Sequence, residues 1–324
     1  GRRIYFERQF SNEMQLARAV GRYARMPQEA VSQQAQAALA AFQAYDARHG
    51  LQDEDHDRAV ETALKHRLTV ISGGPGTGKT TVVVRILACL LAENPDLMIA
   101  GAAPTGKASS NLADSIESAM QRMASGGDGL QKLCELLRKA SPRCQTLHQW
   151  LSERTCGMLP SAEAPLPVDV LVVDECSMMD IGLASRLFAS ISPDRTRLIL
   201  LGDKDQLAAV GPGSVFAALS DKRGALAPWI CEFTRNHRFA TGSRLYRLAK
   251  AVTPEDGGEG SWDSVATILS KSMNASEEGR KDNLIRWVKP RQGETRIGVS
   301  PELQQWLLTE YGVLLSKLRS PSGL

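Results

Sequence analysis

The feature that most constrains the fold of this chain is a glycine-rich segment between an apolar run and a helical stretch. Residues 73–80 read Gly-Gly-Pro-Gly-Thr-Gly-Lys-Thr and fit the pattern G-x-x-x-x-G-K-[ST]. An apolar run at 68–72 precedes the segment, and a predicted helix over 80–91 follows it. Strand, loop and helix in this order predict a unit of a parallel α/β sheet whose loop surrounds phosphate groups. The helix N-terminus adds its positive dipole end.

This loop predicts a site for ATP with Mg²⁺. Lys79 is expected to reach the β- and γ-phosphates, and the Thr80 hydroxyl is expected to ligate Mg²⁺. The alternative is a chance glycine-rich turn, which the flanking strand and helix argue against. The remaining loop residues expected to line the nucleotide are Gly74, Pro75, Gly76, Thr77, Gly78 and Thr81.

Short apolar runs alternate with helical stretches along the middle of the chain. The runs lie at 68–71, 98–100, 170–173 and 198–201. They are typical of buried parallel strands, so the fold class expected is α/β, a doubly wound parallel sheet with helices on both faces. Ligands of such sheets bind at the carboxyl ends of the strands. The chemistry is therefore expected at 73–81, 103–109, 174–178 and 202–207.

Helices are expected over residues 12–46, ahead of the first strand. One apolar stripe recurs there at helical spacing and is predicted to pack in the core, namely Val31, Ala35, Leu39 and Phe42.

The chain is expected to divide into three parts. These are a helical lead-in at 1–50, an ATPase domain at 51–230 and a partial second domain at 231–324. Loops are predicted at 124–129 and 253–260, where glycine gathers with serine, proline or acidic residues.

An acidic pair, Asp174 and Glu175, follows the apolar run at 170–173. Two carboxylates at the end of a buried strand are costly unless a cation offsets their charge. Asp174 is expected to hold Mg²⁺, directly or through water, and Glu175 is expected to activate the attacking water.

Two further residues are candidates for contact with the γ-phosphate. Gln206 lies after the run at 198–201 and is predicted to sense that phosphate, although Gly-Asp at 202–203 is also a common turn sequence. Arg238 is a candidate clamp from the second domain, and an ordinary basic surface cluster is its alternative.

Composition narrows the class of protein. Hydrophobic residues make up 43% of the chain, which is enough for a sizeable core, and the formal net charge of +3 permits a nucleic-acid partner without demanding one. The six cysteines form no C-x-x-C pair, so we expect reduced thiols and no zinc site. No apolar stretch approaches a membrane span and no signal peptide is evident, so a cytoplasmic protein without membrane contact is expected.

Taken in order, five segments resemble the motifs of superfamily 1B DNA helicases of the RecD type. They are the phosphate loop, Ala-Pro-Thr-Gly-Lys-Ala at 103–108, Asp-Glu-Cys-Ser-Met at 174–178, Gly-Asp-Lys-Asp-Gln-Leu at 202–207 and Asn-His-Arg-Phe at 236–239. Thr-Leu-His at 146–148 and the N-terminal residues 3–13 also match RecD-like segments. The resemblance covers roughly residues 1–250.

The resemblance implies a RecA-like ATPase that translocates 5′ to 3′ on single-stranded DNA, within a RecBCD-like recombination and repair complex that has RecB- and RecC-like partners. No nuclease signature is evident. The residues that the family pattern places against DNA are Pro104, Thr105, Lys107, Thr146 and His148.

Two departures from the family pattern stand out. His56 occupies the position ahead of the loop where the family has a glutamine that contacts adenine, and an imidazole can still hydrogen-bond a purine edge. The later helicase motifs are missing, and a helix is predicted at 303–318, so we expect the chain to end early in the second motor domain. The chain also lacks an initiator methionine, which suggests a piece of a longer protein.

Three functions remain open at this point. The first is a DNA-dependent ATPase and helicase motor. The second is a subunit that binds ATP and DNA as a tether without productive turnover, which the missing motifs favour. The third is a small-molecule P-loop kinase, which does not explain the segments at 103–108 and 202–206.

Overall fold

The fold is that of a computed structural model, which describes residues 6–152, 159–206, 209, 211–235, 237, 244–252 and 261–273. The chain divides into two compact units, Gly1–Arg238 and Phe239–Leu324. The three-part division at residues 50 and 230 stays a prediction. The loop predicted at 253–260 and the helix predicted at 303–318 lie outside the described residues.

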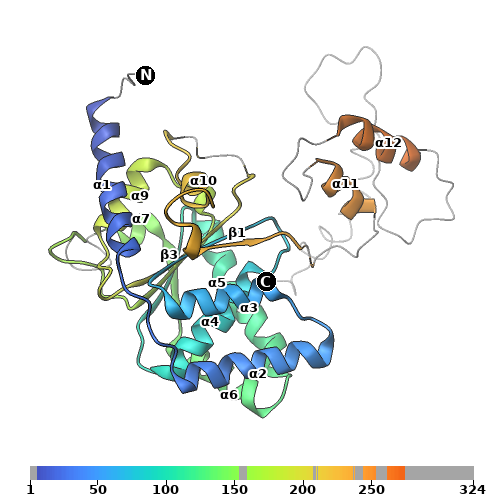
Figure 1. Cartoon of the computed structure of the whole chain (residues 1–324), viewed down its shortest axis with the longest axis horizontal. Coiled ribbons are helices and arrows are strands. Elements are labelled where there is room, and N and C mark those ends of the chain that lie inside the picture. Colours follow the sequence, from blue (N-terminus) through green and yellow to red (C-terminus); the bar gives the residue numbers. More distant parts are fainter. Residues whose placement is uncertain are drawn as a thin grey trace, which may run out of the picture. The chain divides into compact units, whose positions relative to one another are not determined.

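The first unit is built on a parallel sheet of six strands in the order β3-β2-β4-β5-β1-β6 (Figure 1). Every described strand pair is parallel, which confirms the predicted fold class. The strands are β1 (Leu68–Gly73), β2 (Ile99–Ala103), β3 (Arg143–Thr146), β4 (Val170–Val173), β5 (Arg197–Gly202) and β6 (Ile230–Phe233).

Side chains alternate along each strand, so the sheet has two apolar faces. On β4, Val170 and Val172 belong to one core cluster, whereas Leu171 and Val173 belong to the other. β1, β4 and β5 are buried along their whole length, which is why their sequences are continuous apolar runs rather than alternating patterns.

One face of the sheet is covered by five helices of the described chain, two that precede β1 and three that lie between strands (Figure 1). The loop predicted at 124–129 is shorter in the structure, because one flanking helix ends at Ala124 and the next begins at Asp128. The helices on this face are α2 (Gln33–His49), α3 (Glu54–Lys65), α4 (Lys79–Glu93), α5 (Gly106–Ala124) and α6 (Asp128–Ala140).

The other face is covered by α1 (Glu7–Ala24), α7 (Leu147–Trp150), α9 (Ile181–Ala189) and α10 (Val215–Leu219). Tyr23 of α1 packs its ring edge-on against Phe188 of α9, and its hydroxyl donates to the carbonyl of Thr196 at 3.0 Å. Short 3₁₀ turns lie at η1 (Cys176–Met178) and η2 (Ala227–Trp229).

The N-terminal region that was predicted to be helical forms two helices, α1 and α2. They pack on opposite faces of the sheet. The predicted apolar stripe is confirmed as core, since Ala35, Leu39 and Phe42 of α2 are buried and Val31 packs against them. A buried ion pair joins α2 to α4, because the Arg85 guanidinium donates to both carboxylate oxygens of Asp46 at 2.6 and 2.8 Å.

The second unit contains α11 (Arg244–Val252) and α12 (Trp262–Met273) in its described part. The backbone N–H of Ser261 donates to the carbonyl of Ala251, and Val265 is buried. Among the helices in the described part of the whole chain, none combines the length and the apolar character needed to cross a bilayer.

A buried histidine at the C-cap of α3, His66, makes stability depend on pH. Trp229 Nε1 donates to His66 Nδ1 at 2.9 Å, and burial together with the nearby Arg197 lowers the pKa of His66 from its ordinary 6.5. The native state therefore favours the neutral ring. Its contribution to stability is complete above pH 6.5 and is lost as the pH falls from there through the lowered pKa.

The variant His66→Asn tests this prediction, because asparagine keeps an acceptor for Trp229 but does not titrate. Urea unfolding at about pH 7.5 and about pH 5 should show a smaller loss of stability on acidification for His66→Asn than for the wild type. An equal loss in the two proteins would show that His66 does not carry this pH dependence.

Candidate nucleotide-binding site

The glycine-rich loop joins β1 to α4 at the carboxyl edge of the sheet, where the sequence predicts it. Gly76 and Gly78 have φ values of 82° and 86°, in the left-handed region that favours glycine. Gly78 is the N-cap of α4, so the loop leads directly into a helix N-terminus. Such a loop presents several backbone N–H groups to one centre, which is the arrangement that binds phosphate.

The side-chain donors of the loop converge on two of its own carbonyls. The Lys79 ammonium donates to the carbonyl oxygens of Gly73 and Gly74, and the Thr77 hydroxyl donates to Gly74 at 2.8 Å. Lys79 lies in the first turn of α4, together with Thr80 and Thr81. A phosphate oxygen is a stronger acceptor than a carbonyl for an ammonium group, so a bound triphosphate would compete for these donors.

The acidic pair lies directly after β4. The Asp174 carboxylate accepts from the backbone N–H of Glu175 at 2.8 Å. Burial raises the pKa of Asp174, and burial together with the neighbouring Asp174 raises the pKa of Glu175. Lys79 acts in the opposite direction on both carboxyl groups, which places its charge close to them.

Glu175 has an unusual backbone conformation, with φ of 53°. A non-glycine residue in the left-handed region is strained, and such strain gathers at functional sites. This conformation occurs where β4 leads into the short helix η1, and the Glu175 side chain is half-buried there.

The residues at this edge suit a magnesium ion. Mg²⁺ prefers hard oxygen ligands and usually takes one or two carboxylates together with the phosphates of its substrate. Asp174 supplies a half-buried carboxylate whose pKa is raised by burial, and Thr80 supplies a hydroxyl from the loop. Asp174 and Thr80 are thus the residues that would hold the ion.

Gln206 follows β5, the neighbour of β4, and its side chain is tied to the acidic segment. The Ser177 hydroxyl donates to Gln206 Oε1 at 3.1 Å, so η1 and the end of β5 are linked. Arg238, the other γ-phosphate candidate, lies outside the described residues.

His56 contacts the loop from α3. Its Nε2 lies 2.8 Å from the carbonyl oxygen of Thr77, and its ring packs against Phe233. Two neighbours were not identified from the sequence, Asp53 at the N-cap of α3 and His237 after β6. An aspartate N-cap is a recognisable pattern, but nothing in the sequence pairs it with a histidine near the end of the unit.

The residues predicted to face DNA lie at the ends of β2 and β3. Ala103 pairs with Thr146 in the register of the two strands, so the segments that follow, 104–107 and 146–148, start side by side. Thr105 and Thr146 use their hydroxyls as N-caps of α5 and α7, whereas Lys107 and His148 are exposed. Pro104 is half-buried between β2 and α5.

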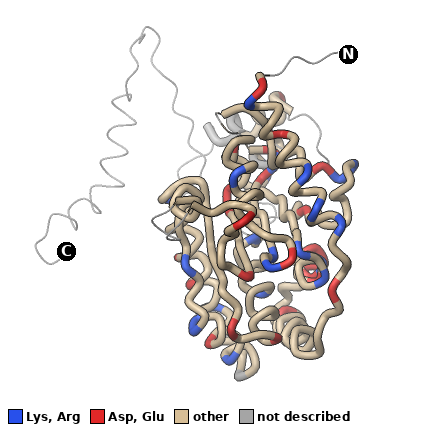
Figure 2. Tube along the Cα trace, turned by 90° about the vertical axis from the view of Figure 1, so that its left-hand side faces the viewer, with Lys and Arg blue, Asp and Glu red and all other residues tan. Residues whose placement is uncertain are grey.

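In the view of Figure 2, the lysine and arginine residues of the described chain are not gathered on one surface. Figure 2 shows lysine and arginine interspersed with aspartate and glutamate along the described trace.

The close packing of His56 on the loop predicts the effect of a methyl group at Gly78. A Cβ there would lie 2.6 Å from His56 Cε1, and the residue has φ of +86°. We expect Gly78→Ala to lower the free energy of unfolding by about 1–3 kcal/mol. Gly74→Ala is the matched control, since its Cβ would meet only Asp203 Oδ2, at 3.9 Å. Equal unfolding midpoints of the two variants in urea would contradict this prediction.

Comparison with known proteins agrees with this architecture. A family model described as "AAA domain" matches residues 56–212. The RecBCD enzyme subunit RecD of Mycolicibacterium smegmatis is 35% identical over 285 residues, which is 84% of this chain and 48% of that protein. RecD of Haemophilus influenzae is 42% identical over 224 residues, or 60% of this chain and 34% of that protein.

Two further proteins match this chain at lower sequence identity than the RecD subunits. The ATP-dependent RecD2 DNA helicase of Deinococcus radiodurans is 34% identical over 64% of this chain and 24% of that protein. Among solved structures, the Pif1 helicase from Candida albicans has a TM-score of 0.38 at 18% identity and covers 81% of this chain and 54% of that one.

The chain spans about half the length of the first of these curated relatives and a smaller share of the others. The residues matched by the family model, 56–212, include the phosphate loop, the acidic pair after β4 and the segment after β5, which follow three adjacent strands of the parallel sheet. The chain belongs to the RecD-like family.

Proposed function

We propose that this chain is the ATP-hydrolysing motor part of a RecD-like DNA helicase. The observation that carries the proposal is the meeting of three groups at the carboxyl ends of β1, β4 and β5. These are the phosphate loop with Lys79, the strained acidic pair Asp174–Glu175 and the Ser177–Gln206 link. This is the set of groups that hydrolysis of a bound triphosphate requires.

Each residue has a role that follows from its chemistry. The loop N–H groups and Lys79 hold the β- and γ-phosphates and stabilise the charge that develops on them. Magnesium, when bound at Thr80 and Asp174, neutralises phosphate charge. Glu175 accepts a proton from the attacking water or orients it, and Gln206 senses the γ-phosphate. Arg238, the last residue of the first unit, adds a guanidinium to the γ-phosphate.

DNA is proposed to run over the ends of β2 and β3. Lys107 and His148 would contact the phosphate backbone there, with Pro104, Thr105 and Thr146 shaping the surface. Contacts of this kind carry no sequence information, which suits a translocating motor. By similarity to RecD, we also propose 5′ to 3′ movement on single-stranded DNA and assembly with RecB- and RecC-like subunits.

The test is ATP hydrolysis by the purified chain, with and without single-stranded DNA, beside Lys79→Ala. Turnover that DNA stimulates and that Lys79→Ala abolishes is the expected result. Tight binding of Mg-ATP without turnover would favour a tethering subunit instead. Absence of Mg-ATP binding by the wild type would overturn the proposal.

A further inference from the structure

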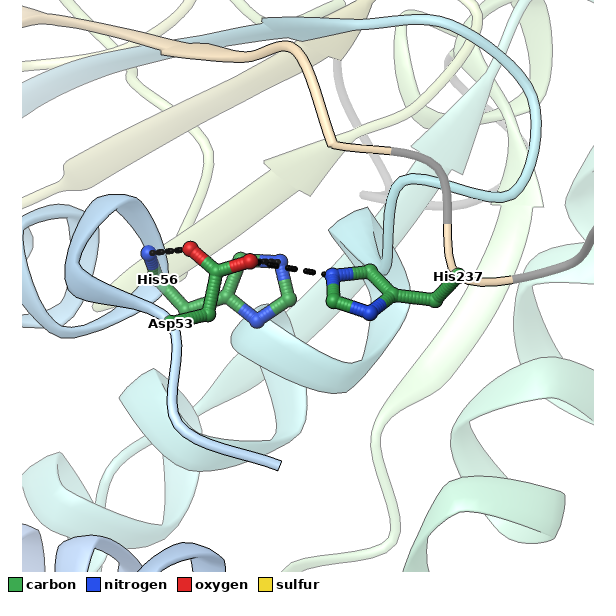
Figure 3. Close-up of side chains that lie close together, drawn as sticks. All are labelled: Asp53, His56 and His237. Carbon is green, nitrogen blue, oxygen red and sulfur yellow. Dashed lines mark hydrogen bonds and ion pairs between the residues drawn. The ribbon is translucent and has the colours of Figure 1, made fainter. Parts of the chain in front are cut away.

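Asp53, His56 and His237 form a compact cluster beside the phosphate loop. Figure 3 shows the Asp53 carboxylate between the two histidines, with the His237 ring pointing toward it. His237 Nε2 lies 3.0 Å from Asp53 Oδ2, and the other carboxylate oxygen of Asp53 accepts from the backbone N–H groups of Asp55 and His56. The cluster thus connects the first turn of α3 to the segment after β6.

Two members of this cluster hold successive carbonyls of the loop from outside. The Thr77 carbonyl can only accept, so the His56 Nε2 that lies 2.8 Å from it carries the proton and donates. The backbone N–H of His237 donates to the carbonyl of Gly76, also at 2.8 Å. The carbonyls of Gly76 and Thr77 are therefore both fixed by groups outside the loop.

The geometry of the peptide bond carries this restraint to the phosphate side. In a planar trans peptide the C=O and the following N–H point in opposite directions. Holding the Gly76 carbonyl outward turns the N–H of Thr77 toward the interior of the loop, where it donates to the carbonyl of Gly74 at 3.4 Å. Holding the Thr77 carbonyl outward turns the N–H of Gly78 inward in the same way. Those inward N–H groups are the ones that a phosphate-binding loop presents to its anion.

The packing around His56 leaves its ring little freedom. The residue is 5% exposed, and its ring centroid lies 4.7 Å from that of Phe233 and 5.1 Å from that of His237. The absence of a side chain at Gly78 makes room for it, since a Cβ there would overlap the imidazole. Burial lowers the pKa of His56, so the ring is neutral and its single N–H is the one used on Thr77.

An aspartate and two histidines arranged in this way can also hold a transition metal, and the ligand atoms of the three residues lie within 4.8 Å of one another. Here the nitrogens that face the cluster already have protein partners, because His56 Nε2 is bonded to Thr77 and His237 Nε2 to Asp53. The arrangement satisfies the hydrogen-bonding groups without an ion, which favours a structural support of the loop.

From these contacts we infer that Asp53, His56 and His237 form a brace that preorganises the phosphate loop for the triphosphate, with His56 as the central positioning residue. The inference rests on the proposed function, because it concerns the same nucleotide site. It assigns the His56 N–H to the loop backbone and not to the base. Preorganisation raises affinity because the loop does not have to be ordered when the ligand binds.

Calorimetric titration of the full chain with Mg-ATP tests the brace through a matched pair of variants. His56→Met keeps a side chain of similar length but removes the donor, and His56→Gln keeps an amide N–H that can reach Thr77. We expect the Kd to rise about tenfold in His56→Met, which leaves a buried carbonyl without its donor, and to stay within about threefold of wild type in His56→Gln.

A second variant covers the case in which His56→Met does not fold. Asp53→Asn keeps the N-cap of α3, because asparagine and aspartate cap equally well, but removes the charge that holds His237. We expect its Kd for Mg-ATP to rise about threefold with an unchanged unfolding midpoint.

Two results would overturn the brace while leaving the nucleotide site intact. One is wild-type affinity in both His56→Met and Asp53→Asn. The other is equal weakening in His56→Met and His56→Gln at equal thermal stability, because the donor would then be irrelevant. If the wild type itself does not bind Mg-ATP, the proposed function fails first, so the two failures are distinguishable.

Discussion

Replacing Asp46 by alanine is expected to lower the free energy of unfolding by about 3–5 kcal/mol, because the change leaves the charge of Arg85 buried without its partner. The side chains of Asp46 and Arg85 are 3% and 5% exposed, and the two groups meet through two parallel hydrogen bonds. The guanidinium also lies over the Phe42 ring, 5.7 Å from its centroid, so little room remains for water to replace the carboxylate.

Urea unfolding of the purified chain measures this effect, and Glu61→Ala is the control. Glu61 and Lys65 form an ion pair at 3.0 Å whose side chains are 48% and 43% exposed. Breaking an exposed pair of this kind changes stability by less than about 1 kcal/mol. A loss at Asp46 as small as that at Glu61 would contradict the prediction.

A double variant separates the cost of the unpaired charge from the value of the pair. Asp46→Leu with Arg85→Met replaces both partners by apolar side chains of similar size. Such replacements are often neutral or stabilising, so the double variant should recover most of the stability that Asp46→Ala loses. Recovery would show that this pair fixes how α2 docks on α4 rather than supplying net stability.

The strands in the middle of the sheet were predictable because burial on both faces leaves a continuous apolar run. β1, β2, β4 and β5 all coincide with predicted runs, apart from small shifts at the ends such as Met98, which precedes β2. β3 and β6 were missed for a physical reason. They are the two edge strands of the described sheet. β3 reads Arg-Cys-Gln-Thr with no fully buried residue, so it carries no apolar signal, and β6 reads Ile-Cys-Glu-Phe, where a glutamate interrupts an apolar run of only four residues.

In the candidate site, the features formed by contiguous residues were predictable from the sequence, and the contacts between distant residues were not. The phosphate loop and the acidic pair are contiguous segments whose neighbours in sequence define their context, and the structure places both at the predicted edge. The contact of Asp53 with His237 joins residues that are 184 positions apart, and no local pattern encodes it. The left-handed backbone of Glu175 was likewise invisible, because glutamate has no preference for that conformation.

The second large effect is expected at Glu175. Glu175→Gln should reduce ATP turnover by about 10²–10⁴-fold, because an amide cannot accept the proton of the attacking water. Its affinity for Mg-ATP should stay within about threefold of wild type, since glutamine has the same length and the loop contacts with phosphate are intact. Steady-state hydrolysis and calorimetric titration of the same preparations measure the two quantities.

The variant Glu175→Gly distinguishes the loss of the carboxylate from the relief of backbone strain. The φ of 53° at Glu175 is costly for glutamate and free for glycine, so Glu175→Gly should raise the free energy of unfolding by about 1 kcal/mol while turnover falls as in Glu175→Gln. A variant that gains stability and loses hydrolysis would show that the strain at the end of β4 is retained because it places this carboxylate. If Glu175→Gly were less stable than wild type, the strain would not be relieved there, and if Glu175→Gln kept normal turnover, Glu175 would not be the base.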